Sequence, residues 1–234
     1  MIDLRKMDWP HRKHGPLQSL SSSVWRVEGP VPGLLVSRQM IVVRDDQRRL
    51  LLHSAIALDE SRQRALEQLG TMTWLVVPNG YHRLDAPAYK ARYPSLSVVA
   101  PSGAAPRVER VVRVDLLYEQ FPTHPTIRFH VAPWPNPMEG VLEIRSAEGT
   151  TLVFNDLVFV PPRSGVSSWP YRLFRSGPQV PWLAKRMIMA DASRLREWLL
   201  RLSSAERLVC IVPGHGDPIL DDAPAALRAI AASI

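Results

Sequence analysis

Cysteine is almost missing from the chain, and long hydrophobic runs are missing altogether. The 234 residues include one cysteine, Cys210, so no disulfide forms within a chain and no group of thiolates holds a metal. Because Cys210 stands inside an apolar run, we expect a buried thiol without a chemical role. No apolar stretch approaches the ~18 residues that a membrane helix needs. The sequence therefore indicates neither a disulfide-stabilised fold nor a membrane-spanning helix.

The N-terminal residues lack the apolar segment of a secretory signal. Residues 1–16 are polar and are interrupted by Pro10 and Pro16, so we expect the protein in the cytoplasm. Residues 1–22 are basic and then rich in serine, which is typical of an arm of uncertain order. We expect a single domain over residues 23–234.

Acidic residues are fewer than basic ones. The chain has 29 Lys and Arg against 22 Asp and Glu, which gives a formal net charge of +7. An excess of this size suits either a soluble basic surface or a polyanionic partner. The basic residues are spread along the chain, and no recognition helix or RNA-binding pattern accompanies them. We therefore expect no nucleic-acid partner, and a nuclease function would rest on the charge alone.

The first half of the chain has the pattern of a buried parallel sheet. A strand over 24–30 precedes a hairpin whose turn lies near Asp45. Asp59 begins a helix that Gly70 ends. Strands and helices then alternate, which predicts parallel strands with helices on their faces. The expected hairpin strands are 34–44 and 49–54, and the later elements are a strand at 74–77, a helix at 86–92 and a strand at 97–100.

The second half has strands without helices between them, followed by helices. Four strand-like segments predict a second, largely antiparallel sheet. Residues 192–202 form an amphipathic helix, then a strand over 208–212 and a closing helix from about Ala223 complete the chain. The four segments are 108–117, 126–131, 141–145 and 151–159, and the expected buried face of the amphipathic helix comprises Leu195, Trp198, Leu199 and Leu202.

Residues 161–192 are rich in Pro, Trp and Arg. One interpretation is an inserted helical segment that packs on the body of the domain. The other is a substrate lid, or a surface through which two copies of the chain form a homo-oligomer. Both remain open at this stage.

Polar side chains follow three of the expected strands. His82 and Asp85 come after the strand at 74–77, Asp156 comes after an apolar run, and His215 follows the last strand. In layered α/β proteins, sites usually lie at the carboxyl ends of buried strands. We therefore expect these four side chains at one edge of the fold.

Three motifs resemble the metallo-β-lactamase fold, a four-layer αββα sandwich of two mixed sheets flanked by helices. They are Leu50–Ser54, Val153–Phe159 and Ile211–Pro218, and the likeness runs from about residue 24 to the end. The resemblance implies that Asp156 matches an aspartate that bridges two metal ions. It also implies that His215, in the loop Pro-Gly-His-Gly, matches a histidine ligand.

The chain departs from this family where most of the metal ligands are expected. The family's H-x-H-x-D-H motif is replaced by residues 78–85, where only His82 and Asp85 remain. The loop with the next ligand histidine corresponds to residues 132–140, which contain no histidine. The Pro-Asn pair followed by a histidine resembles an uncharacterised branch of the same fold. The resemblance therefore implies a divergent site with fewer ligands.

Two functional hypotheses follow. In the first, His82, Asp156 and His215 bind one zinc, iron or manganese ion, and Asp85 orients or deprotonates a water that attacks a small ester, amide, thioester or phosphoester. In the second, the fold has lost its metal and binds a ligand or protein partner as a catalytically inactive scaffold.

Each site residue also has a structural interpretation. His82 suits a loop hydrogen bond and Asp85 suits a helix N-cap, whereas Asp156 would pair with the loop around His215. His53 and His130 stand in β-like runs and are expected to be structural, although each is a reserve ligand together with His124.

Overall fold

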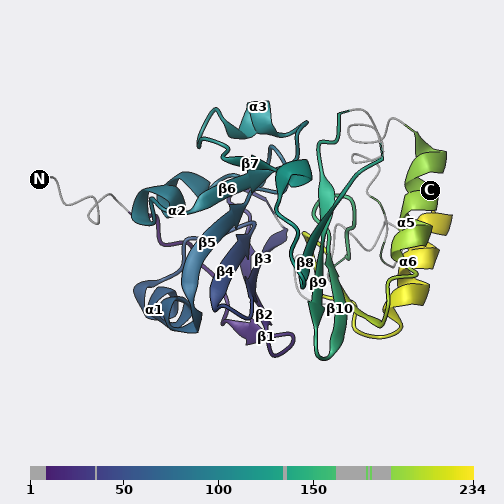
Figure 1. Cartoon of the computed structure of the whole chain (residues 1–234), viewed down its shortest axis with the longest axis horizontal. Coiled ribbons are helices and arrows are strands. Elements are labelled where there is room, and N and C mark those ends of the chain that lie inside the picture. Colours follow the sequence, from purple (N-terminus) through teal and green to yellow (C-terminus); the bar gives the residue numbers. More distant parts are fainter. Residues whose placement is uncertain (1–8, 35, 134–135, 162–177, 179, 181–190) are drawn as a thin grey trace, which may run out of the picture. The chain divides into compact units, whose positions relative to one another are not determined.

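The computed structural model describes residues 9–34, 36–133, 136–161, 178, 180 and 191–234 (Figure 1). These residues form two compact units. Unit 1 comprises Met1–Pro30 and Met40–Pro122, and unit 2 comprises Val31–Gln39 and Thr123–Ile234. Each unit contains one β-sheet with its own helices. The segment 161–192, expected to be an inserted excursion or a lid, lies almost entirely outside the described residues.

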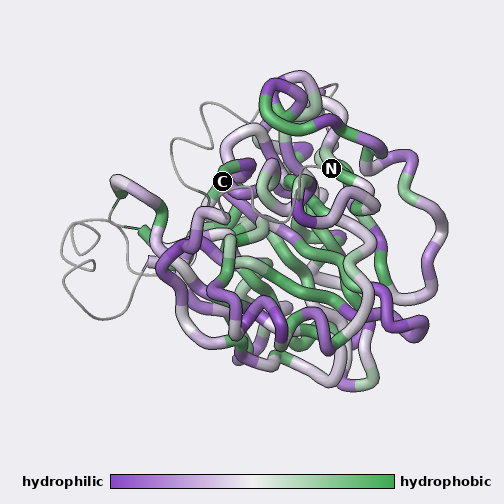
Figure 2. The backbone as a smooth tube through the Cα atoms, turned by 90° about the vertical axis from the view of Figure 1, so that its left-hand side faces the viewer, coloured by the Kyte–Doolittle hydropathy of each residue, from purple (hydrophilic) through white to green (hydrophobic). Residues whose placement is uncertain are grey.

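The sheet of unit 1 has seven strands in the order β1-β2-β3-β4-β5-β6-β7. A β3–β4 hairpin is antiparallel, whereas β4 through β7 are parallel. The strands are β1 (Gln18–Ser19), β2 (Val24–Pro30), β3 (Ser37–Arg44), β4 (Arg49–His53), β5 (Thr71–Val76), β6 (Ser97–Ala100) and β7 (Leu116–Leu117). Figure 2 shows hydrophobic residues along these strands and mostly hydrophilic residues in the turns.

Most local sequence signals in this half are confirmed, although Asp85, which stands before the helix at residues 86–92, makes no side-chain capping hydrogen bond. The carboxylate of Asp45 accepts hydrogen bonds from the N–H groups of Gln47 and Arg49, at 3.0 and 2.8 Å, and closes the predicted hairpin. Helix α1 (Glu60–Leu69) begins after Asp59, whose side chain accepts from the N–H of Arg62, and α2 (Ala86–Arg92) has its expected bounds. Strands and helices then alternate to give the predicted parallel order.

One expectation for unit 1 is wrong. Residues 108–117 were expected to be a strand of the second sheet, but the chain instead forms the short helix α3 (Ala105–Val108), a turn, and β7 in the first sheet. Val108 and Val112 stand four residues apart, and both are buried in the core of unit 1. Val108 and Val112, which pack on that core, have helical rather than strand spacing, whereas Val111 between them is exposed.

The described part of the N-terminal arm is bonded to unit 1. The indole N–H of Trp9 donates to the carbonyl of Leu58, and its ring packs edge-on against Tyr89 with centroids 5.0 Å apart. Arg12 donates through Nε to the buried carboxylate of Asp85 at 2.9 Å. Trp9 and Arg12 therefore fasten the arm to the segments that follow β4 and β5, and β1 pairs with β2.

The sheet of unit 2 has four strands in the order β11-β10-β9-β8. Strands β8 (Ile127–Val131), β9 (Gly140–Ser146) and β10 (Gly149–Val153) are antiparallel, as predicted, and β11 (Leu208–Val212) is parallel to β10. Helices α5 (Ala192–Leu202) and α6 (Ala223–Ala232) pack on each other, and α6 packs on β11 (Figure 1). All four apolar residues expected on the inner face of α5 are buried, and Cys210 is a buried free thiol.

Among the described residues, none of the helices has both the length and the apolar character that crossing a membrane requires.

The contacts of Asp85 give a first prediction. Asp85→Asn keeps the size of the side chain but turns an amide N–H₂ towards either Arg12 or the N–H of Ala57, both of which now donate to the carboxylate. Because Arg12 is partly exposed, we expect a loss of about 1–3 kcal/mol in the free energy of unfolding, measured with urea. The exposed Asp46→Asn is the control and should change stability by less than about 0.5 kcal/mol. Equal stability of the two variants would contradict an anchoring role for Asp85.

Candidate functional site

Asp156 and His215 come together because β10 and β11 are parallel neighbours. Val153, at the end of β10, pairs with Val212, at the end of β11. Parallel strands release their chains at the same end, so the turn after β10 lies beside the loop after β11. There His215 Nε2 is 3.1 Å from Asp156 Oδ1. Both side chains are only partly exposed, at 18% for His215 and 23% for Asp156.

The imidazole of His215 is held at both nitrogens. Nδ1 donates to the carbonyl of Ser37 at 2.5 Å, and Nε2 faces the carboxylate of Asp156. Burial alone would lower the pKa of His215, and the charge of Arg38 acts in the same direction. The hydrogen bond and negative charge of Asp156, with the Ser37 carbonyl, outweigh both and raise that pKa above its ordinary value. Both nitrogens therefore donate when this pair forms an ion pair.

Close approach accounts for the two glycines beside His215. A Cβ atom on Gly214 would lie 2.8 Å from the backbone carbonyl carbon and oxygen of Asn155, and the N–H of Gly214 donates to that oxygen at 3.2 Å. Gly216 has a φ of +93°, and a Cβ atom there would lie 1.9 Å from the carbonyl oxygen of Val160. The glycines allow the loop with His215 to lie directly on the segment with Asp156.

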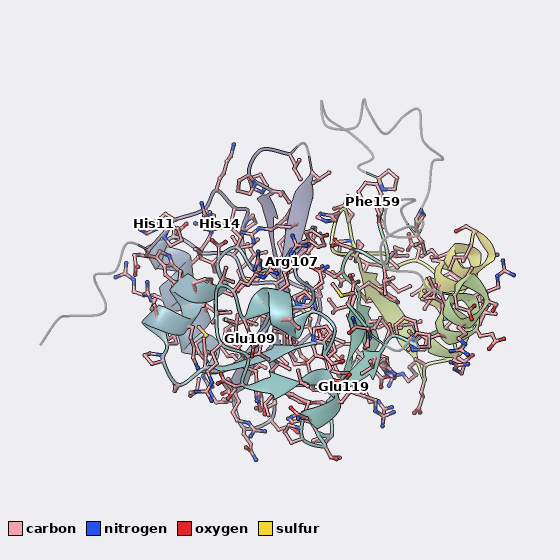
Figure 3. The ribbon with its side chains drawn as sticks, turned by 90° about the horizontal axis from the view of Figure 1, so that it is seen from above. His11, His14, Arg107, Glu109, Glu119 and Phe159 are labelled. Atoms are coloured by element: carbon pink, nitrogen blue, oxygen red, sulfur yellow. The ribbon has the colours of Figure 1, made fainter. Side chains whose placement is uncertain are left out.

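The start of β3 fastens the same loop. The backbone N–H of Gln39 donates to the carbonyl of Gly214 at 3.1 Å, and its side-chain amide donates to the carbonyl of Gly216 at 3.0 Å. Phe159, labelled in Figure 3, forms an isolated bridge with His215, and the two rings lie 6.4 Å apart. His215 is therefore fixed by backbone contacts on several sides.

His82 lies in unit 1, in a turn that Asn79 organises. The side-chain oxygen of Asn79 accepts from the N–H groups of Tyr81 and His82 at 2.8 and 3.0 Å, which is an Asx-turn. A hydrogen bond of 2.9 Å joins His82 Nδ1 to the hydroxyl of Ser54, which follows β4. The backbone and the imidazole of His82 are both oriented by these bonds, although His82 stands in a loop.

The three histidines considered as reserve ligands have structural partners or deep burial. Burial, with the nearby charge of His82, lowers the pKa of His53 to about 3, so His53 is neutral, and among the described residues its Nδ1 has no hydrogen-bond partner. His130 Nε2 bonds to Glu143 at 2.6 Å. Burial would raise the pKa of Glu143, but the hydrogen bonds from His130 and Arg145 outweigh it, and the pKa falls. His124 Nδ1 accepts from the N–H of Thr126 at 3.3 Å.

The structure brings together two of the predicted site residues and bonds a third, Asp85, to the N-terminal arm. Asp156 and His215 are paired within unit 2. Asp85 bonds to Arg12 and to the N–H of Ala57, so its contacts are those of an anchor, and its catalytic role stays a prediction. His82 is ordered within unit 1, and its place in a shared site stays a prediction as well.

The sequence patterns did not reveal three residues that orient His82 or the turn with Asp156, namely Ser54, Asn79 and Glu139. Asn79 holds the turn of His82, and Ser54 bonds to its ring. The Pro-Asn-Gly sequence was a usable signal for the role of Asn79. Glu139 is fully buried, and its carboxylate accepts from three backbone N–H groups of the turn with Asp156. No spacing in the sequence indicates that contact.

Comparison with known proteins identifies the fold. No protein-family model matches the chain, and no curated protein matches it either. A metallo-beta-lactamase from Pontibacter korlensis superposes with a TM-score of 0.62 at 13% identity, covering 95% of this chain and 100% of that one. The DIM-1 metallo-beta-lactamase superposes with a TM-score of 0.60 at 14% identity, covering 95% of this chain and 98% of that one. The chain therefore has the metallo-β-lactamase fold, as its motifs predict.

The conformation of Gly216 gives a second prediction. Gly216→Ala places a methyl group against the carbonyl of Val160 in a left-handed backbone, whereas Gly33, at a φ of +79°, has no described atom within 4 Å of an added Cβ. Gly33→Ala measures the cost of the conformation alone, roughly 1 kcal/mol. Gly216→Ala should cost at least about 2 kcal/mol more in urea unfolding. Equal losses would contradict the close packing of the loop with His215.

The ion pair of His215 and Asp156 gives a third prediction, for the metal-free protein. A histidine whose pKa is raised on folding stabilises the fold below its unfolded pKa, and this contribution is lost as the pH rises through the folded value. The free energy of unfolding should therefore fall as the pH rises from the ordinary value of 6.5 through the raised pKa. Unfolding in urea with a chelator present measures it. Asp156→Asn should abolish this part of the slope, and an unchanged slope would contradict the coupling.

Proposed function

We propose that the protein is a divergent metal-dependent hydrolase in which Asp156, His215 and His82 bind one divalent metal ion. The observation that carries the proposal is the pair of Asp156 and His215 at the ends of two parallel strands of unit 2, in a fold shared with metallo-β-lactamases. A carboxylate and an imidazole are suitable donors for zinc, iron or manganese.

The chemistry of the pair supports a metal ion. Protonated His215 donates through Nε2 to Asp156 Oδ1 at 3.1 Å, and a metal ion takes the place of such a proton when its ligands are deprotonated. Histidine ligands usually donate their second ring N–H to a carbonyl or carboxylate, which fixes the ring. Nδ1 of His215 has that partner in the carbonyl of Ser37. The residues present therefore fit a metal ligand set.

His82 supports the proposal from unit 1. With Nε2 as the ligand atom, Nδ1 would keep its proton and donate to the hydroxyl of Ser54, which lies 2.9 Å away. Both histidines then use the same nitrogen as ligand and the other for orientation. Three protein ligands are the number that catalytic zinc sites keep while leaving a position open.

The reaction we propose is hydrolysis of a small ester, amide, thioester or phosphoester. A divalent metal ion, when bound, supplies the Lewis acidity that lowers the pKa of water and polarises the bond to be cleaved. Asp156 and His215 hold their atoms in place through the backbone contacts of their turn and loop. We propose in addition that Asp85 orients or deprotonates the water. The activity of Asp85→Asn tests this role.

A second function is favoured by one specific observation. The carboxylate of Asp156 and the imidazole of His215 satisfy each other as an ion pair, so the pair needs no metal to be stable. A scaffold that binds a ligand or a protein partner would use the same residues for stability. This alternative predicts that removing either residue destabilises the fold and that the parent protein binds no metal.

Our fourth prediction separates the two functions. Calorimetric titration of the metal-free parent with Zn²⁺ or Mn²⁺ should give one site, and Asp156→Ala, His215→Ala and His82→Ala should each weaken it at least about 100-fold, since each removes a ligand. His130→Ala is the matched control, because His130 bonds to Glu143. Its metal affinity should be unchanged, and circular dichroism should show all variants folded.

The activity arm uses a panel of chromogenic esters, thioesters and phosphodiesters. The parent with metal should hydrolyse at least one class, and Asp156→Ala should not. Full metal affinity in Asp156→Ala or His215→Ala would contradict the proposed ligand set. No binding by the parent, together with lower melting temperatures for both variants, would support the scaffold instead.

A further inference from the structure

The turn that carries Asp156 is clamped by a buried carboxylate from elsewhere in unit 2. Glu139 precedes β9 and is 0% exposed. Its Oε1 accepts from the N–H groups of Asn155 and Leu157, and its Oε2 accepts from the N–H of Asp156, all at 3.0 Å. Three successive backbone amides therefore converge on one anionic group.

We infer that Glu139 is a positioning residue that fixes the direction of the Asp156 side chain for metal binding, an inference that rests on the proposed function. Successive N–H groups that point the same way form an anion-binding nest, and hydrogen bonds to a carboxylate are among the stronger ones. With the amides of residues 155–157 fixed, the backbone on both sides of Asp156 is fixed. The Cα–Cβ direction of Asp156 follows from that backbone.

The exposures of the two acids suit different tasks. Glu139 is fully buried and Asp156 is partly exposed, so Glu139 acts behind the site while the carboxylate of Asp156 stays accessible. The loop of His215 holds the same turn through the hydrogen bond from Gly214 to the carbonyl of Asn155. Glu139 and this loop together fix the turn at both its N–H and its carbonyl groups.

Glu139→Gln disturbs the hydrogen bond from the N–H of Asp156 more than those from Asn155 and Leu157. The amide oxygen of glutamine can keep the position of Oε1 and accept from Asn155 and Leu157. The amide nitrogen would then stand at the position of Oε2, where its N–H₂ faces the N–H of Asp156. The N–H₂ group of the glutamine and the backbone N–H of Asp156 are both donors, so no hydrogen bond would form between them. The substitution therefore disturbs Asp156 without removing the side chain.

Glu143, four residues further along the chain in β9, provides a matched control. It is also a buried glutamate, 4% exposed, but its carboxylate bonds to His130 and Arg145 and not to the turn. Glu143→Gln removes a buried negative charge in the same unit, so it reproduces a general loss of stability. A role of Glu139 that is only structural would give the two variants the same metal affinity once both are folded.

Our fifth prediction concerns Zn²⁺ affinity, measured in the full chain at neutral pH by competition with a chromophoric chelator. Glu139→Gln should bind Zn²⁺ about 10–100-fold more weakly than the parent, as is usual when a group that orients a ligand is lost. Glu143→Gln should stay within about threefold of the parent, since it orients none of the ligands. Glu139→Asp keeps both oxygens on a shorter side chain, and it should recover part of the affinity and serve if Glu139→Gln does not fold.

A second readout needs no metal. Amide hydrogen exchange of the metal-free protein, followed by NMR, should be at least about tenfold faster at residues 155–157 in Glu139→Gln than in the parent, because the clamp protects these amides. The amide of Phe154 bonds to the carbonyl of Val212 and is the internal reference that should not change. Glu143→Gln should leave residues 155–157 protected.

The outcomes separate the inference from the proposed function. If the parent binds Zn²⁺ and Glu139→Gln binds it as tightly as Glu143→Gln, the positioning role is overturned and the proposed function stands. If the parent binds neither Zn²⁺ nor Mn²⁺, the proposed function fails. Faster exchange at residues 155–157 would then still support Glu139 as the residue that positions Asp156, and unchanged exchange would overturn it.

Discussion

The parallel pairing of β10 with β11 is the constraint on which the candidate site depends. It puts the ends of two strands that are distant in the sequence beside each other, which brings Asp156 to His215. Everything else in unit 2 refines this meeting. Gly214 and Gly216 let the loop approach, Ser37 orients the imidazole, and Glu139 holds the turn of Asp156 from behind.

The same pair explains why two functions remain reasonable for one fold. An ionised carboxylate and a protonated imidazole form an ion pair, and in the proposed function the same carboxylate and the deprotonated imidazole bind a metal ion. Competition between the proton and the metal ion therefore decides the state of the site. Because each group is already oriented by backbone contacts, little reorganisation would separate the two states.

The sequence predicted the elements whose signals are local. The four apolar residues of α5 and the N-cap at Asp59 follow from short-range patterns, and the structure confirms them. The strand expected over residues 151–159 instead ends at Val153. The strand predicted over residues 108–117 was wrong because valine favours strands and the helical spacing of Val108 and Val112 was not considered. Glu139 and the anchor of Asp85 were beyond prediction, since each depends on a contact between segments far apart in the chain, with the backbone or with the N-terminal arm.

The metal content of the protein tests the central claim most directly. The full chain would be purified without chelators and without a metal-affinity column, and its metals counted by plasma mass spectrometry. The account predicts about one zinc, iron or manganese ion per chain, as three protein ligands would hold. No metal, with no change of melting temperature when Zn²⁺ or Mn²⁺ is added, would contradict it, and two ions per chain would contradict the single site.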